Sequence, residues 1–176
     1  MYVITGTSGT GKSTLVAALV ARGYDGFEEP VRKTLRYHLS IDGPALPSKN
    51  PTLFIETMLS DCRSDFERAS MSDKVSFFDR GIPDLIAYAN RFGVSSPILA
   101  ETAKANRYNQ NVFLLPPWEG IFQEDEFRKA SFSEYRDFHK LIVRSYTDFG
   151  YNLIEVPCVS NDLRVAFIEA AISKLA

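Results

Sequence analysis

Short apolar runs alternate along this chain with segments in which apolar residues recur at helical spacing. Four continuous runs cover residues 2–5, 75–78, 111–115 and 151–156, and a weaker run covers residues 24–28. Strands that are buried on both faces have this appearance, and the helices between them make the crossovers that a parallel sheet needs. The pattern therefore predicts an α/β fold with a five-stranded parallel sheet flanked by helices.

The predicted helices have apolar stripes and recognisable ends. The stripes are formed by Leu15, Val16, Leu19 and Val20, by Val31, Leu35 and Leu39, by Phe54, Met58, Cys62 and Phe66, and by Tyr135, Phe138, Leu141, Ile142, Tyr146 and Phe149. Pro30 and Pro83 suit the first turn of a helix. Ser131 with Glu134 fits a capping box. Residues 40–51 are rich in helix-breaking residues and are expected to form a surface loop.

Composition and charge favour a single domain over residues 1–176. The chain is 45% hydrophobic, and its net charge of -2 offers no basic surface for nucleic acid. No leader peptide and no apolar run of membrane-spanning length are recognised, so we expect a cytoplasmic protein without a membrane partner. Cys62 and Cys158 lie far apart in the sequence and are expected to be buried thiols in a reducing compartment.

The turn after the first predicted strand has the pattern GxxxxGK[S/T] and precedes a predicted helix. Small residues let successive backbone amides converge on phosphate groups, and the helix adds its positive N-terminal end. Lys12 would contact the β- and γ-phosphates, and the hydroxyl of Ser13 would bind magnesium. The predicted nucleotide-binding residues are Gly6, Thr7, Ser8, Gly9, Thr10, Gly11, Lys12, Ser13 and Thr14.

This motif resembles that of the P-loop nucleoside-triphosphate-binding proteins. The resemblance implies a three-layer P-loop fold, with ATP and Mg²⁺ as cofactors. An Asn-Lys-x-Asp guanine-recognition motif, which a G protein would carry, is missing from the sequence, and its length leaves little room for the extra helical domain of a typical AAA+ motor.

The second predicted strand ends at two glutamates, Glu28 and Glu29. A carboxylate here would face the place where the γ-phosphate meets its acceptor, as a general base or as a ligand of magnesium-bound water. The stretch Glu-Pro-Val resembles that of deoxynucleoside kinases, and the resemblance implies that Glu29 is the base. Alternatively, both glutamates complement the dipole of the next helix. Arg32 and Arg36 fall one turn apart on the same helical face, and Arg32 is expected to be solvated.

The third predicted strand ends in Asp79 and Arg80. At the carboxyl end of a parallel strand beside the P-loop, Asp79 would reach magnesium, and Arg80 would point at a phosphate, a substrate group or Glu29. The segment DRGIPD resembles the Asp-Arg segments of thymidine and thymidylate kinases. It is still more similar to that of a family of small predicted ATPases and kinases that includes the ribosylnicotinamide kinase domain of NadR. Asp84 either caps its helix or touches substrate.

The segment of about residues 117–131, after the fourth predicted strand, is expected to be a LID. In P-loop kinases a LID closes over the phosphates, and Arg128 is the candidate for stabilising transition-state charge. The similarity to the NadR-like family extends through LPPW to this arginine, although the segment is otherwise mostly acidic. Trp118 either stacks on substrate or covers the edge of the core.

The turn after the fifth predicted strand is the candidate wall of an adenine pocket. In P-loop kinases this turn lies against the adenine ring, which assigns residues 157–159 either to that wall or to a purely structural turn. We expect Arg164, in the following helix, on the surface. His38 and His139 show no partner spacing and are expected to be packed or solvated.

Two functional hypotheses follow for the protein as a monomer or homodimer. The first is a small-molecule kinase that transfers a phosphoryl group from Mg-ATP to a nucleoside- or nucleotide-like acceptor, with Lys12, Glu29, Asp79, Arg80 and Arg128 as catalytic residues. The second is a regulatory ATPase or GTPase module without a small-molecule acceptor. Stimulation of ADP release by an acceptor distinguishes them.

Overall fold

The computed structural model of this protein describes residues 1–121 and 131–175. At its centre is one sheet of five parallel strands, in the order β2-β3-β1-β4-β5. The strands are β1 (Tyr2–Gly6), β2 (Asp25–Phe27), β3 (Ser76–Asp79), β4 (Asn111–Leu115) and β5 (Asn152–Glu155). All five predicted strands are confirmed.

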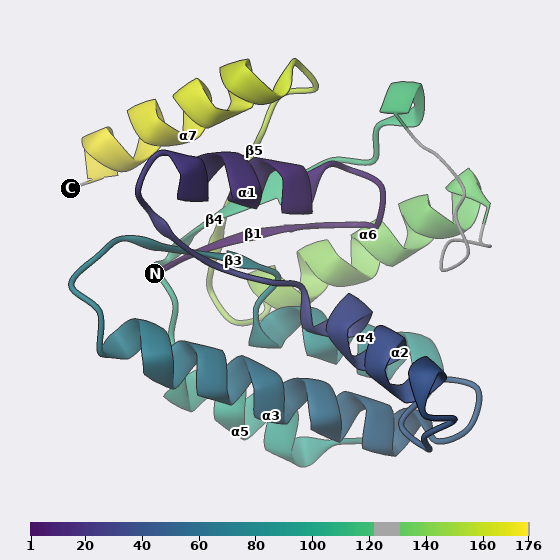
Figure 1. The fold of residues 1–176 in the computed structure, drawn as a ribbon. Helices are drawn as coiled ribbons and strands as arrows, with labels where there is room; N and C mark the ends of the chain where they lie inside the picture. The colour runs from purple at the N-terminus through teal and green to yellow at the C-terminus, as the bar shows by residue number, and fades with distance from the viewer. Residues whose placement is uncertain (122–130, 176) are drawn as a thin grey trace.

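Helices cover both faces of the sheet and complete a three-layer fold (Figure 1). The helices are α1 (Lys12–Ala21), α2 (Pro30–Ser40), α3 (Pro51–Ser70), α4 (Ile82–Phe92), α5 (Pro97–Ala105), α6 (Phe132–Thr147) and α7 (Asn161–Leu175), with a short 3-10 turn η1 (Glu119–Ile121). Helices α1 and α7 lie on one face, and α2 to α6 lie on the other. Within the described ranges, we find no helix with the length and apolar surface needed to span a bilayer.

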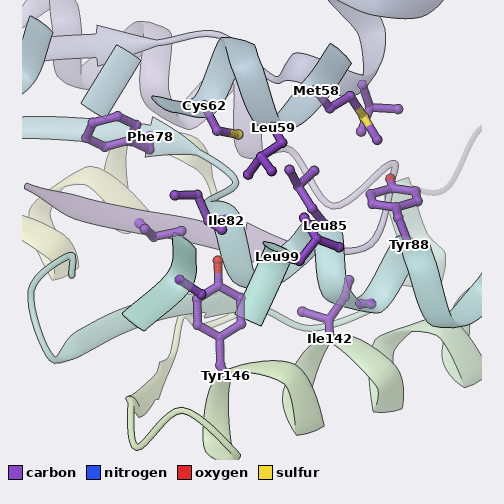
Figure 2. Packing of buried hydrophobic residues seen from close by; sticks show 14 of the residues in the cluster. Met58, Leu59, Cys62, Phe78, Ile82, Leu85, Tyr88, Leu99, Ile142 and Tyr146 are labelled. Carbon is purple, nitrogen blue, oxygen red and sulfur yellow. The ribbon is translucent and has the colours of Figure 1, made fainter. Parts of the chain in front are cut away.

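Successive side chains of β1 alternate between two hydrophobic cores, as the pleat of a strand requires. Tyr2 and Ile4 pack in the core formed with α1 and α7, whereas Val3 packs in the larger core on the opposite face. Figure 2 shows part of this larger core, where α3 meets α4 and Tyr146 of α6 points its hydroxyl toward α4. The two cores hold β1 at the centre of the sheet. Because the strands are parallel, the loop that follows β1 lies at the edge where all five strands have their carboxyl ends.

The ends of several elements follow the sequence signals. Pro30 is the first residue of α2, and the hydroxyl of Ser131 accepts a hydrogen bond from the Glu134 amide at the start of α6. Residues 41–50 form the loop between α2 and α3. The expectation for Cys158 is wrong, because this thiol is exposed in the turn after β5, outside both cores.

Candidate active site

The turn between β1 and α1 borders a cavity of about 280 Å³. Gly9 and Gly11 have φ angles of 83° and 89°, in the left-handed region that favours glycine. Gly6 has φ 138°, and a Cβ there would lie 2.3 Å from a carbonyl oxygen of β4. The cavity is lined by Ser8, Gly9, Gly11, Lys12, Ser13, Thr14, Glu29 and Arg32. The other predicted loop residues, Gly6, Thr7 and Thr10, are buried behind it.

Lys12 brings a buried ammonium group to this cavity. Its Nζ donates a hydrogen bond to the carbonyl oxygen of Thr7, at 2.8 Å. Burial, with the guanidinium of Arg80 nearby, lowers the pKa of Lys12 to about 8, although the carboxylates of Asp79 and Glu29 oppose the shift. A neutral carbonyl compensates a buried ammonium only in part, because it carries no full negative charge. The phosphates of a nucleotide carry such charge and would be stronger partners for Lys12.

Asp79, at the end of β3, lies beside Ser13 at the start of α1. The Ser13 hydroxyl donates to Asp79 Oδ2 at 2.6 Å, and Oδ1 is buried without a hydrogen-bond partner among the described residues. Burial, together with Glu29, raises the pKa of Asp79 to about 6, against the effect of Lys12 and Arg80. A buried carboxylate oxygen without a partner, beside a hydroxyl, fits Mg²⁺, which binds few protein oxygens and keeps phosphate and water ligands. The described residues contain no cluster of three or more His, Cys, Asp or Glu side chains that would hold a metal by themselves.

Glu29 and Glu28 have opposite environments. Glu29 is buried at the cavity wall, and its Oε1 lies 2.6 Å from Nε of Arg80, while Oε2 lies 3.4 Å from Nε of Arg32. Burial alone would raise the pKa of Glu29, but the adjacent guanidinium of Arg80, with Lys12 and Arg32, lowers it to about 2. Glu28 instead forms an exposed pair with Arg36 at 3.0 Å. Of the two carboxylates, Glu29 therefore faces the phosphate loop.

Arg80 links the loop, β3 and α4. It is 1% exposed, and its positive φ of 76° is rare for a residue with a side chain. Its Nη1 donates to the Gly6 carbonyl at 2.8 Å and to Asp84 Oδ1 at 3.0 Å, in addition to the bond from Nε to Glu29. Strained conformations of this kind persist where the surroundings fix them, and they cluster at functional sites.

Asp84 is a buried anchor of this network, and its two carboxylate oxygens accept hydrogen bonds from side chains and a backbone amide around it. Its Oδ2 accepts from the Gly81 amide at 2.9 Å and from the Tyr146 hydroxyl at 2.5 Å, and its Oδ1 accepts from Thr5 at 2.7 Å. The helix-capping alternative is thus the one observed. The partners Thr5 and Tyr146 were missed, since their contacts span 79 and 62 positions of sequence and leave no local signal.

A second cavity, of about 260 Å³, adjoins the first and lies among α2, α3, α4 and α6. Its lining is mostly apolar and aromatic: Ser8, Val31, Leu35, Pro47, Phe54, Tyr88, Arg91, Phe92, Tyr135 and Phe138. Arg91 is the one charged residue among the described residues that line it, and its Cζ lies 4.9 Å from the ring centroid of Phe138. Ser8 borders both cavities.

The remaining predicted residues, three arginines and one tryptophan, differ in where the structure places them. Arg128 lies outside the described residues. The expectation for Arg164 is wrong: it is 3% exposed, and its Nη1 donates to the Thr10 carbonyl at 2.8 Å. Trp118 packs on this arginine, with 4.8 Å between Cζ and the ring centroid. Arg32 is also not simply solvated, because it lines the phosphate-loop cavity.

The sheet order, the glycine-rich turn and the helices on both faces define an α/β fold of the P-loop nucleoside-triphosphate-binding type. Residues 1–164 match the model of the family AAA_28, which is described as an AAA domain. The chain belongs to this family. Comparison of the sequence with curated proteins gives no match.

Several solved structures share the fold. NadR in complex with NR superposes with a TM-score of 0.70 and 19% identity, over 98% of this chain and 50% of NadR. Deoxyadenosine kinase from M. mycoides with the products dCMP and dCDP has a TM-score of 0.65 and 16% identity, over 98% of both chains. YorR from Bacillus subtilis in complex with phosphorylated GDP has a TM-score of 0.57 and 15% identity, over 98% of this chain and 95% of YorR. The predicted fold class and family resemblance are confirmed.

Proposed function

We propose that this protein transfers the γ-phosphoryl group of Mg-ATP to a nucleoside-like acceptor. One observation carries the proposal: the phosphate-loop cavity and the aromatic cavity adjoin at Ser8, with Glu29 in the wall of the first. A donor in the first cavity and an acceptor in the second would meet beside that carboxylate. The solved structures of the same fold include a deoxyadenosine kinase with bound dATP, which supports the same class of reaction.

On the donor side, the loop amides and Lys12 would bind the phosphates. Ser13 and Asp79 would hold Mg²⁺, which would supply positive charge to neutralise the charge that develops on the phosphates during transfer. Positioning and charge neutralisation account for most of the catalysis in such reactions. The residues at this cavity supply both, and Arg128 remains the proposed LID arginine.

On the acceptor side, Glu29 is proposed to bind the attacking hydroxyl. With a pKa of about 2, Glu29 is a weak base, so its contribution is to accept the hydrogen bond and orient the oxygen. A largely dissociative transition state needs little proton abstraction before transfer, and the hydroxyl proton is lost late. The ion pair with Arg80 would hold the carboxylate in place.

The aromatic cavity favours an acceptor with a flat ring system. The rings of Phe54, Tyr88 and Phe92 line this cavity, and a heterocyclic base that stacked on one of them would gain about 1–3 kcal/mol. Arg91 would donate to a carbonyl or another acceptor atom on the base. These features favour a nucleoside over a flexible aliphatic alcohol.

A panel of nucleosides and nucleoside monophosphates, assayed for stimulation of ADP release, tests this proposal. We expect at least one to stimulate release, and we expect Arg91→Met to raise its KM while leaving kcat almost unchanged. Arg144→Met is the matched control, because this arginine is 78% exposed and pairs with Asp148 on the outer face of α6. Tight ATP binding with no stimulation by any acceptor would contradict the kinase proposal and favour a regulatory ATPase.

A further inference from the structure

Carbonyl groups of a phosphate-binding loop must face away from the phosphate, because their oxygens would repel it. In this protein, three carbonyls of the loop are each held by a cationic side chain at 2.8 Å: Gly6 by Arg80, Thr7 by Lys12 and Thr10 by Arg164. Lys12 would move to the nucleotide when it binds. The two arginines lie outside the loop, Arg80 directly after β3 and Arg164 in α7, so they can keep their bonds during nucleotide binding.

Arg164 is the unexpected member of this set. It is 3% exposed at the start of α7, and its hydrogen bond to Thr10 spans 154 positions of sequence. Its Nε donates to the Pro157 carbonyl at 3.1 Å, and the Trp118 ring covers its guanidinium. This one side chain therefore joins the phosphate loop, the turn after β5 and the segment after β4.

The geometry points to Arg164 as a positioning residue for the nucleotide phosphates. A trans peptide unit is planar, so its carbonyl and its N–H point in opposite directions. Holding the Thr10 carbonyl toward α7 turns the N–H of Gly11 away from α7, and Gly11 lines the phosphate-loop cavity. Arg164 thus orients an amide donor for phosphate without touching the nucleotide. This inference rests on the proposed nucleotide binding.

The test compares ATP and AMP binding to Arg164→Met by titration calorimetry. AMP lacks the β- and γ-phosphates, so loss of a phosphate donor weakens ATP selectively. We expect the Kd for ATP to rise about tenfold or more and the Kd for AMP to rise less than about threefold. The control is Arg22→Met, which removes the same charge from a 57% exposed arginine that links the end of α1 to Glu169 of α7. This variant should bind both nucleotides as the wild type does.

A purely structural role for Arg164 predicts a different result. Thermal stability would fall while the ratio of the AMP and ATP dissociation constants stays at the wild-type value, and this outcome would overturn the inference. If the Met variant does not fold, Arg164→Lys is the test: it keeps the charge but replaces the guanidinium fork by a single donor nitrogen, which cannot reproduce the separate bonds from Nε and Nη1, so the same selective loss of ATP binding is expected. A wild-type protein that binds ATP but phosphorylates no acceptor contradicts the kinase proposal alone. Unchanged ATP selectivity in the variants contradicts the role of Arg164 alone.

Discussion

Replacing Glu29 by Gln removes one partner of a buried ion pair and isolates its contribution to stability. Lowering the pKa from its ordinary value of 4.5 to about 2 corresponds to about 3 kcal/mol of stabilisation at neutral pH. Removal of one partner of a buried pair typically costs 3–5 kcal/mol. In Glu29→Gln, Arg80 still bonds to Asp84 and to the Gly6 carbonyl, so we expect the loss of stability to lie near the lower end of this range.

The stabilisation that Glu29 provides should depend on pH in a definite direction. A carboxylate whose pKa is depressed in the folded protein stabilises it fully above about pH 4.5, and the stabilisation is lost as the pH falls toward 2. In urea unfolding, the stability difference between wild type and Glu29→Gln should be about 3 kcal/mol at pH 7 and roughly 1 kcal/mol at pH 3.

Glu28→Gln is the control for this experiment. Its exposed pair with Arg36 should contribute less than about 1 kcal/mol at either pH. A stability difference for Glu29→Gln that stays constant between pH 7 and pH 3, or that equals the effect of Glu28→Gln, would refute the reasoning.

Three further substitutions test other parts of the site. Lys12→Ala should weaken ATP binding by about tenfold or more, because a charge-assisted contact is lost; a calorimetric Kd equal to that of the wild type would contradict the phosphate-loop assignment. Gly6→Ala should cost about 2–4 kcal/mol in urea unfolding, through strain and overlap with β4. Gly23→Ala, where φ is 98° but nothing lies within 4 Å, should cost less, and equal losses would argue against the overlap. Tyr146→Phe should destabilise by about 1–3 kcal/mol by removing the hydroxyl donor to Asp84, and a change under about 0.5 kcal/mol would count against this network.

Features of the site that depend on local sequence could be predicted. The glycine turn and its lysine follow a fixed spacing between a strand and a helix, and the structure shows that context. Asp79 and Glu29 could be placed near the loop because the carboxyl ends of parallel strands share one edge. The choice of Glu29 over Glu28 depended on a resemblance, because two adjacent carboxylates give no pattern that decides which is buried.

Features that depend on distant contacts could not be predicted. Arg164 looks like a surface residue in its helix, and only the fold brings it to the Thr10 carbonyl. The buried bond from Arg80 to Glu29 likewise spans 51 positions of sequence, and no local signal indicates it or the positive φ of Arg80. The aromatic cavity combines residues of four helices, and the apolar stripes predicted for three of them (α2, α3 and α6) indicated only a core when taken singly.

The most direct test of the proposed function follows the γ-phosphoryl group itself. The protein is incubated with γ-labelled ATP, Mg²⁺ and an acceptor from the nucleoside panel, and the labelled products are separated by chromatography. Lys12→Ala is the inactive control. We predict that the label appears in a phosphorylated nucleoside in the wild type and not in the variant. Label recovered only in inorganic phosphate, whatever acceptor is added, would contradict phosphoryl transfer to a small molecule.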